Sequence, residues 1–411
     1  MTDLVPTPPP ERQLGQPPSQ LSSFLEVLLA FTRLGLTSFG GPVAHLGYFR
    51  AEFVHRRRWL DEHTYADLVA LCQFLPGPAS SQVGMALGLS RAGLWGALAA
   101  WLGFTLPSAV LLVAFALGVS TAGDLGHAGW LHGLKIVAVA VVAQAVLGMA
   151  RTLTPDRPRA AMALGAAIAA LLLTNALAQV LIIAVSALIG WRFLPAGPPA
   201  GGAELPLALP RRLGATFLAL FVSLLVLLPV LRDTIGGPAL SLFDAFYRAG
   251  SLVFGGGHVV LPLLQAEVVP PGWVTHDDFL AGYGATQAVP GPLFTFSAYL
   301  GAVSQVGLNR LLAASIALVA IFLPSFLLVA GALPFWSVLR TKTAVQSALR
   351  GINAGVVGLL LAALYTPVFT SAVKAPLDFA LVLSAFALLE YAKLPPWSVV
   401  ALAALAGWWL F

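Results

Sequence analysis

The sequence FTRLGLTSFGGPVAHL at residues 31–46 recurs, with substitutions, as FYRAGSLVFGGGHVVL at residues 246–261. Further along the chain, QFLPGP at 73–78 recurs as QAVPGP at 287–292. An arginine, a Phe-Gly-Gly break and a Gln-x-x-Pro-Gly-Pro break therefore appear twice, in the same order, within strongly apolar sequence. Two later matches extend the repeat: Leu106-Pro107-Ser108 with Leu323-Pro324-Ser325, and Gly190-Trp191 with Gly407-Trp408. The duplication predicts two structural units that build one site together.

The composition is that of a membrane protein. Of the 411 residues, 58% are hydrophobic and 9% are charged, and the mean hydropathy is +0.88. Soluble domains carry roughly 25% charged residues. Several uncharged runs approach the roughly 20 residues that a bilayer crossing requires. We therefore expect an all-α polytopic membrane protein in contact with lipid.

The repeat divides the chain into four parts. Residues 1–20 are a Pro-rich polar tail, expected to be disordered. Two transporter repeats, at 21–195 and 236–411, flank a linker at 196–235, in which the run 213–231 predicts one extra transmembrane helix. Each repeat contains six apolar segments: 22–48, 64–89, 92–120, 130–150, 160–175 and 177–194 in the first, and 239–263, 277–301, 311–333, 349–368, 376–391 and 396–411 in the second.

The loops suggest how the repeats are oriented. The first carries His55-Arg56-Arg57-Arg58, where the second has Pro270-Pro271-Gly272 followed by His276-Asp277-Asp278. Basic loops stay in the cytoplasm, so the two copies are predicted to have opposite orientations, provided that the first two segments of each are broken or re-entrant. Inverted repeats place a substrate site near the bilayer midplane in many secondary transporters. The net charge of +5 then belongs to cytoplasmic loops and does not indicate nucleic acid.

The breaks have the chemistry of an anion site. Gly40 and Gly41, with Gly255 and Gly256 in the second copy, weaken a helix by about 1 kcal/mol each relative to alanine. The Pro-Gly-Pro turns around Gly77 and Gly291 interrupt it more strongly, because proline lacks an amide hydrogen. A helix that restarts at Ala79, or at Leu293 in the second copy, presents free amides and the positive end of its dipole, which suits an anion.

Polar side chains that recur, or that follow the breaks, complete the candidate set. Arg33 and Arg248 offer planar, permanent charge to a tetrahedral oxyanion, although an arginine near a helix end also snorkels to the surface. Gln73 and Gln287 either donate to the anion or form a packing hydrogen bond. Three hydroxyls either bind the substrate or cap a helix: Ser80, Ser81 and Thr295. Two recurrent carboxylates are candidate proton carriers: Glu52 and Glu267.

Several other classes of function find no support. The single Cys72 excludes an internal disulfide, and the seven histidines show no metal-ligand spacing. Neither a Walker-type nucleotide loop nor a catalytic nucleophile with its base is present. We therefore expect no metal, no cofactor and no enzymatic activity. A homodimer is compatible with the sequence.

These motifs resemble those of the chromate ion transporter family in its long two-domain form. The resemblance rests on LGLTSFGGPVAHLGYFRAEFVHRRRW and QFLPGPASSQVGMALG in the first half, and on FGGGHVVLPLLQAEVV and QAVPGPLFTFSAYLG in the second. The resemblance covers the whole chain except the N-terminal tail and the linker helix. It implies a bacterial inner-membrane protein that exports chromate from the cytoplasm at the expense of the proton motive force.

The residues alone leave two alternatives open. Sulfate has the same shape and charge as chromate, so arginines and helix ends do not decide between them, and a sulfate or other oxyanion transporter remains the second hypothesis. An ion channel or a membrane scaffold also fits the composition, but a scaffold does not explain the paired arginines.

Overall fold

The computed structural model describes residues 20–121, 129–173, 176–195, 209–254, 257–339 and 342–411. Over these residues every regular element is a helix, so the predicted all-α class is confirmed. Five stretches are long and apolar enough to cross a membrane: Ala79–Gly118, Gly129–Leu153, Arg211–Ile235, Arg310–Phe335 and Thr343–Ala372. The tail at 1–19 lies outside the described residues.

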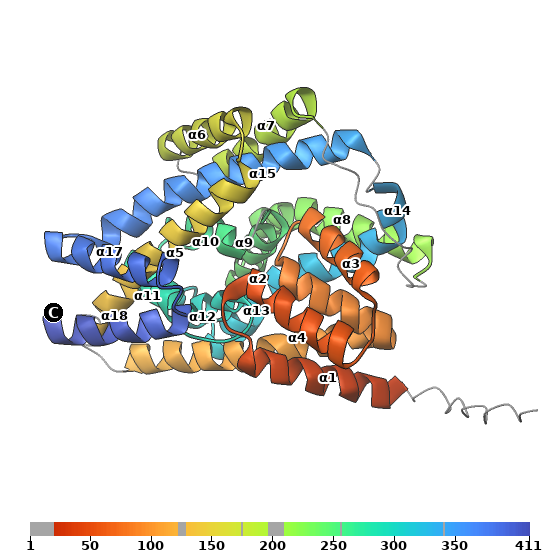
Figure 1. Ribbon diagram of the computed structural model, residues 1–411, viewed down its shortest axis with the longest axis horizontal. Helices are drawn as coiled ribbons and strands as arrows, with labels where there is room; N and C mark the ends of the chain where they lie inside the picture. Colours follow the sequence, from red (N-terminus) through yellow and green to blue (C-terminus); the bar gives the residue numbers. More distant parts are fainter. Residues whose placement is uncertain (1–19, 122–128, 174–175, 196–208, 255–256, 340–341) are drawn as a thin grey trace, which may run out of the picture.

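The described part of the first repeat contains the π-helix η1 (Arg50–Arg56) and seven α-helices, shown in red to yellow-green in Figure 1. The seven α-helices are α1 (Gln20–Thr37), α2 (Gly41–Phe49), α3 (Glu62–Phe74), α4 (Ala79–Thr121), α5 (Gly129–Leu153), α6 (Arg157–Leu172) and α7 (Ala176–Phe193). Helix α1 ends before Gly40 and Gly41, whose positive φ angles of 97° and 77° suit glycine. The predicted Phe-Gly-Gly break is therefore confirmed.

The predicted second and third segments are separate, but the second is itself divided. The Pro-Gly-Pro turn divides the predicted segment 64–89 into α3 and the start of α4. The rest of α4 is a second helix, because the backbone angles at Ala92 and Gly93 are not helical. The chain folds back there, so that a Cβ on Gly88 would collide with the Gly96 carbonyl oxygen. The predicted boundary between 64–89 and 92–120 is therefore confirmed.

The second repeat follows the same order. Its described α-helices of eight or more residues are α9 (Pro238–Ser251), α10 (Val260–Val268), α11 (His276–Thr286), α12 (Phe296–Val303), α13 (Arg310–Ala332), α15 (Thr343–Ala363), α17 (Pro376–Glu390) and α18 (Pro396–Leu410). Before it, α8 (Arg211–Ile235) is the linker helix that the run 213–231 predicted. Helix α8 packs against α9 and α13, where the Tyr247 hydroxyl donates to the Phe221 carbonyl over 3.0 Å.

Corresponding helices pack in corresponding ways within each repeat. Helix α1 lies along α4, and α9 lies along α13. Both contacts need a glycine, because a Cβ on Gly35 would lie 2.7 Å from the Gly103 carbonyl oxygen, and one on Gly250 would collide with the Ile321 carbonyl oxygen. Such small residues let helix backbones approach closely in membrane proteins.

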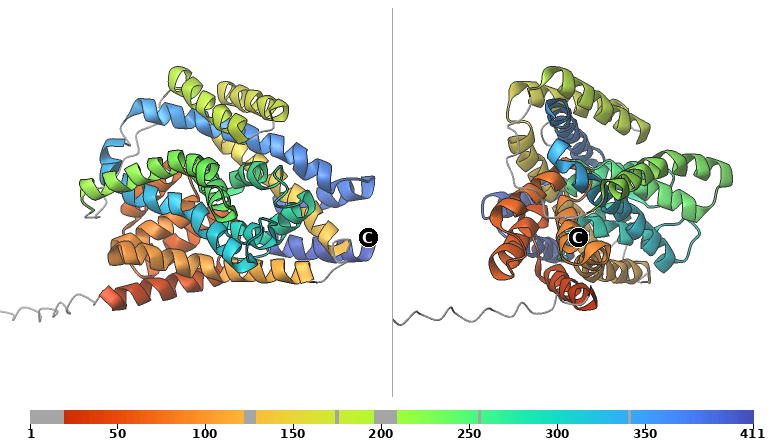
Figure 2. Two further views of the ribbon diagram at one scale, coloured as in Figure 1. Left: turned by 180° about the vertical axis from the view of Figure 1, so that it is seen from behind. Right: turned by 90° about the vertical axis from the view of Figure 1, so that its right-hand side faces the viewer.

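The last helices of each repeat pack on the other repeat. Helices α6 and α7 cover α15, and α17 and α18 cover α5, as Figures 1 and 2 show from different sides. Glycines again mark the contacts: Gly190 lies against Gly351 and Gly407 lies against Gly133. The repeats predicted at 21–195 and 236–411 are therefore interlocked rather than separate bodies.

Charged side chains separate toward the two ends of α5. Near its start, Lys135 pairs with Asp277 over 3.2 Å. Near its end, Arg151 pairs with Glu390 over 2.8 Å, and Lys393 reaches the same carboxylate at 3.5 Å. The positive-inside rule assigns Arg151 and Lys393 to the cytoplasm and Asp277 to the outside. Their placement at opposite ends of one helix agrees with that assignment.

Candidate functional site

The two kinds of break meet across the repeats. The Gly77 amide donates to the Val253 carbonyl over 2.6 Å, and the Gly291 amide donates to the Ser38 carbonyl over 2.9 Å. Val253 and Ser38 each directly precede a Phe-Gly-Gly sequence. The Pro-Gly-Pro turn of each repeat is thus bonded to the Phe-Gly-Gly break of the other. A reciprocal pattern of this kind is what a two-fold relation between units produces.

The repeated Leu-Pro-Ser sequences supply the surface on which the turns rest. Gly77 has a φ of 122°, and an added Cβ would lie 2.5 Å from Ser325 Oγ. Gly291 has a φ of 97°, and an added Cβ would lie 2.9 Å from Ser108 Oγ. Each turn glycine therefore lies against the serine of the opposite repeat. Backbone conformation and available space both require glycine here.

A cavity of about 220 Å³ lies at one of these crossings. It combines four of the predicted residues: Gly40 and Gly41 from the first repeat, and Gln287 and Gly291 from the second. Gln144 of α5 also lines it, nine residues after Lys135 and seven before Arg151. At 1.5 Å per residue, the cavity lies roughly 10–14 Å from the charges at either end of α5. It is a small polar space between the two ends of a membrane-spanning helix.

Buried hydroxyl groups without a hydrogen-bond partner gather around the breaks. Among the described residues they include Ser38, Ser81, Thr105 and Ser297. Ser81 follows the first Pro-Gly-Pro turn and Ser297 follows the second. Buried polar groups are normally paired, and polar residues inside a membrane protein commonly mark a path for substrate or ions. These hydroxyls give the crossing region polar groups that are free to bind a ligand.

The other predicted groups at the turns have different surroundings. Ser80 lies 3.3 Å from His45 Nδ1, and the Gln73 side chain is exposed. The Thr295 amide and hydroxyl both donate to the Pro292 carbonyl. The expectation that this amide is free is therefore wrong, because the second helix restarts with a tight 3₁₀ turn, η4 (Leu293–Thr295). Gly255 and Gly256 lie outside the described residues.

The two recurrent arginines have different environments. Arg33 is exposed on α1. Arg248 lies 2.7 Å from Glu267 and 3.2 Å from Asp244, and Asp244 also pairs with Arg232 over 2.9 Å. Arg248 and Glu267 line a second cavity of about 260 Å³. Arg232 also pairs with Asp233 over 2.9 Å, so the arginine and carboxylate of the second repeat lie in one cluster of two arginines and three carboxylates.

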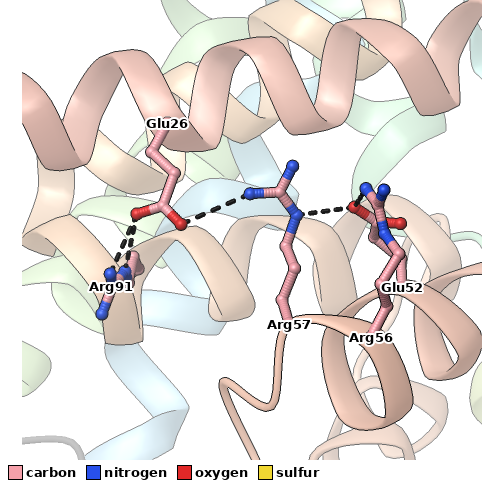
Figure 3. A network of polar contacts seen from close by, with 5 residues as sticks. All are labelled: Glu26, Glu52, Arg56, Arg57 and Arg91. Carbon is pink, nitrogen blue, oxygen red and sulfur yellow. Dashed lines mark hydrogen bonds and ion pairs between the residues drawn. The ribbon is translucent and has the colours of Figure 1, made fainter.

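The basic loop of the first repeat forms an ion-pair network (Figure 3). Glu26 of α1 lies between Arg91 at 2.9 Å and Arg57 at 3.3 Å, and Glu52 binds Arg57 at 2.6 Å and also Arg56. Partial burial of Glu52 opposes its ionisation, but the hydrogen bonds from the two arginines outweigh this and hold the pKa of Glu52 below its ordinary value. A carboxyl group that stays ionised is a poor proton carrier.

Three residues near these cavities were not predicted. Asp244 precedes Arg248 by four residues, the spacing of a helical ion pair, so the sequence contained a usable signal. The first repeat has Leu29 at this position. Val43 occupies the position of His258 in the first repeat, so recurrence gives no signal for this histidine, and Gln144 has no motif around it. Only tertiary packing brings the turn η3 (Gly257–Val259) and helix α5 to the same cavity.

Comparison with known proteins identifies the family. The sequence model described as "Chromate transporter" matches residues 25–191 and 240–408. The chain belongs to the chromate transporter family. It is 30% identical over 413 residues to a chromate transport protein of Pseudomonas aeruginosa, covering 95% of this chain and 93% of that protein. No solved structure matches it.

More distant relatives are also named as transport proteins or transporters. A chromate transport protein of Cupriavidus metallidurans is 24% identical, with 93% of this chain and 92% of that protein covered. An uncharacterized transporter of Methanocaldococcus jannaschii is 25% identical over 83% of each chain. The family and the apolar helices together make this a multi-pass membrane transporter. The names of its relatives agree with the expectation that it is not an enzyme.

Proposed function

We propose that the protein exports chromate from the cytoplasm across a bacterial inner membrane and so confers chromate resistance. The observation that carries the proposal is the cavity at the crossing, to which the first repeat contributes Phe-Gly-Gly and the second contributes Gln-x-x-Pro-Gly. Family membership supports chromate as the transported ion. The depth of Gln144 along α5 supports a substrate site near the middle of the membrane.

The cavity can hold an oxyanion through neutral donors. Helix α2 begins at Gly41, so its first-turn amides lack partners within the helix. The Gln287 side chain donates one amide hydrogen to the Thr286 hydroxyl over 3.3 Å, and its second amide hydrogen is available to the anion. At the twin crossing, Gly77, Ser80 and Ser81 form the corresponding half-site. Substrate passes between these half-sites as the repeats move.

The membrane potential favours export of a dianion. An inside-negative potential contributes about 2.3 kcal/mol per charge per 100 mV, so expulsion of a doubly charged oxyanion is driven by the electrical part of the proton motive force. Protonation of Glu267 would break its bond to Arg248 and add a chemical part. Glu267 is therefore a better candidate for coupling than Glu52, which two arginines hold.

The decisive experiment compares two substrates in one preparation. Purified protein is reconstituted into vesicles, and radiolabelled chromate or sulfate flux is measured with an imposed potential, with an imposed pH gradient, and with neither. We expect saturable chromate flux that the potential accelerates, and lower chromate accumulation in expressing cells than in cells with empty vector. Sulfate flux without chromate flux would make the protein a sulfate transporter. Flux that does not saturate indicates a channel, and no flux of either ion supports a scaffold.

A further inference from the structure

The cavity presents a histidine that no recurrent motif accounts for. His258 lies in the short 3₁₀ turn η3 (Gly257–Val259) that leads into α10, and it lines the cavity beside Gly41 and Gln287. Its Nδ1 lies 2.6 Å from the hydroxyl of Tyr283 on α11. The ring is therefore fixed at Nδ1, which leaves Nε2 for a ligand in the cavity that this residue lines.

The partner of Nδ1 determines which nitrogen carries the hydrogen. Tyr283 is fully buried, with 0% exposure, and its ring packs edge-on against Phe296. A buried phenol needs an acceptor for its hydrogen. In the described part of the chain the only partner of that hydroxyl is His258 Nδ1, so the phenol donates, Nδ1 accepts and Nε2 carries the hydrogen. No carboxylate bonds to the ring among the described residues, which favours neutral imidazole.

We propose that His258 is a substrate-binding, specificity-determining donor, and that Tyr283 positions it by fixing the Nε2–H tautomer. This proposal rests on the assignment of the cavity as the oxyanion site. The Nε2–H, the second amide hydrogen of Gln287 and the first-turn amides of α2 are all donors. They suit a tetrahedral dianion whose four oxygens only accept, such as chromate or sulfate. Hydrogen phosphate has an O–H that needs an acceptor and fits this donor set less well.

The test separates a donor from a structural role. His258→Ala is expected to raise the KM for chromate by about tenfold or more, the cost of one hydrogen bond to a charged group, with kcat much less affected. His258→Gln keeps an N–H near the position of Nε2 and is expected to restore most of the affinity. Tyr283→Phe removes only the hydroxyl and is expected to raise KM by about threefold, since the wrong tautomer becomes accessible.

The control variant is His63→Ala, which removes an exposed histidine outside the cavity and should leave KM unchanged. All variants are reconstituted at equal protein content, so differences in yield do not enter KM. In the wild type, unlabelled sulfate should compete with chromate more strongly than phosphate does at equal concentration. In His258→Ala the difference between competition by sulfate and competition by phosphate should become smaller.

Three results would overturn the proposal: an unchanged KM in His258→Ala, no recovery in His258→Gln relative to His258→Ala, or equal competition by sulfate and phosphate in the wild type. If His258→Ala does not fold, the comparison of Tyr283→Phe with wild type still decides, because an unchanged KM there removes the positioning role. A wild-type protein that moves sulfate but not chromate contradicts the proposed function instead. The same variants are then measured with radiolabelled sulfate.

Discussion

The same carboxylate position has different partners in the two repeats. In the first, Glu52 is bound by Arg56 and Arg57 from its own loop. In the second, that loop has no arginine, and the corresponding Glu267 binds Arg248 on α9 instead. The arginine in the first repeat that matches Arg248 is left exposed on α1. Sequence repetition thus preserved the backbone breaks, while the charged partners diverged with the loops.

The largest expected effect concerns the orientation of the two loops. A single cysteine replaces His63 or His276 in a Cys72→Ala background, since Cys72 is buried and both histidines are exposed. In inverted repeats a membrane-impermeant thiol reagent labels His63→Cys only from the cytoplasm and His276→Cys only from outside. Intact cells expose the outer side to the reagent, and inside-out vesicles expose the cytoplasmic side. Labelling of both positions from one side would end the inverted-repeat hypothesis.

The turn glycines should be almost as sensitive. Gly77→Ala and Gly291→Ala each place a Cβ against a serine of the other repeat at a positive φ, which costs on the order of 1–3 kcal/mol of backbone strain before any clash. Transport and thermal stability in detergent are expected to fall in both. Gly47→Ala is the matched control, because a Cβ there meets nothing within 4 Å. A loss in one glycine variant alone would show that the two crossings are not equivalent.

Substitution of Arg248 and substitution of Arg33 should have different effects. Arg248→Gln leaves the buried Asp244 and the partly buried Glu267 without that cation, and a carboxylate in the interior that loses a partner destabilises the fold. Lower abundance in the membrane is therefore expected, and Glu267→Gln added to Arg248→Gln should partly restore it. Arg33→Gln removes an exposed side chain that lines neither of the two cavities described, so abundance and transport are both expected to stay near the wild-type level. Loss of transport by Arg33→Gln at normal abundance would place Arg33 in the substrate site.

Much of the fold followed from residues with strong local effects. The breaks at Gly40, Gly41 and Gly77 depend on backbone conformation that each position largely determines by itself. The linker helix and the helical class depend on the length and hydropathy of each run. These features need no knowledge of distant contacts, and they were predicted with nearly correct bounds.

The candidate site was less predictable because it depends on contacts between the repeats. Glycine spacing does not reveal that Gly77 bonds to Val253, or that Ser325 of the other repeat lies beside it. Nor does it reveal His258, whose place at the cavity depends on the contact of its turn with Tyr283 on α11. Recurrence in both repeats does not indicate His258 either, because a site between two diverged repeats needs only one copy of each donor.

The smallest expected effects come from substitution of the two carboxylates, Glu52 and Glu267, whose responses to pH should differ. Because Glu52 has a lowered pKa, its ion pairs stabilise the fold above the ordinary glutamate pKa of about 4.3 and are lost as the pH falls through the lowered value. Glu52→Gln should therefore cost about 1 kcal/mol or less near neutral pH, since the arginines are partly exposed. Its transport should respond to an imposed pH gradient as in the wild type.

Glu267→Gln is the matched substitution in the second repeat. It should lose the response to a pH gradient and keep the response to the membrane potential, because the substituted amide side chain cannot take up a proton and the dianion still carries its charge. Thermal unfolding and vesicle flux measured on both variants give the comparison. If Glu52→Gln instead removes the pH response, the arginines around it release the carboxylate during transport, and the first repeat carries the coupling.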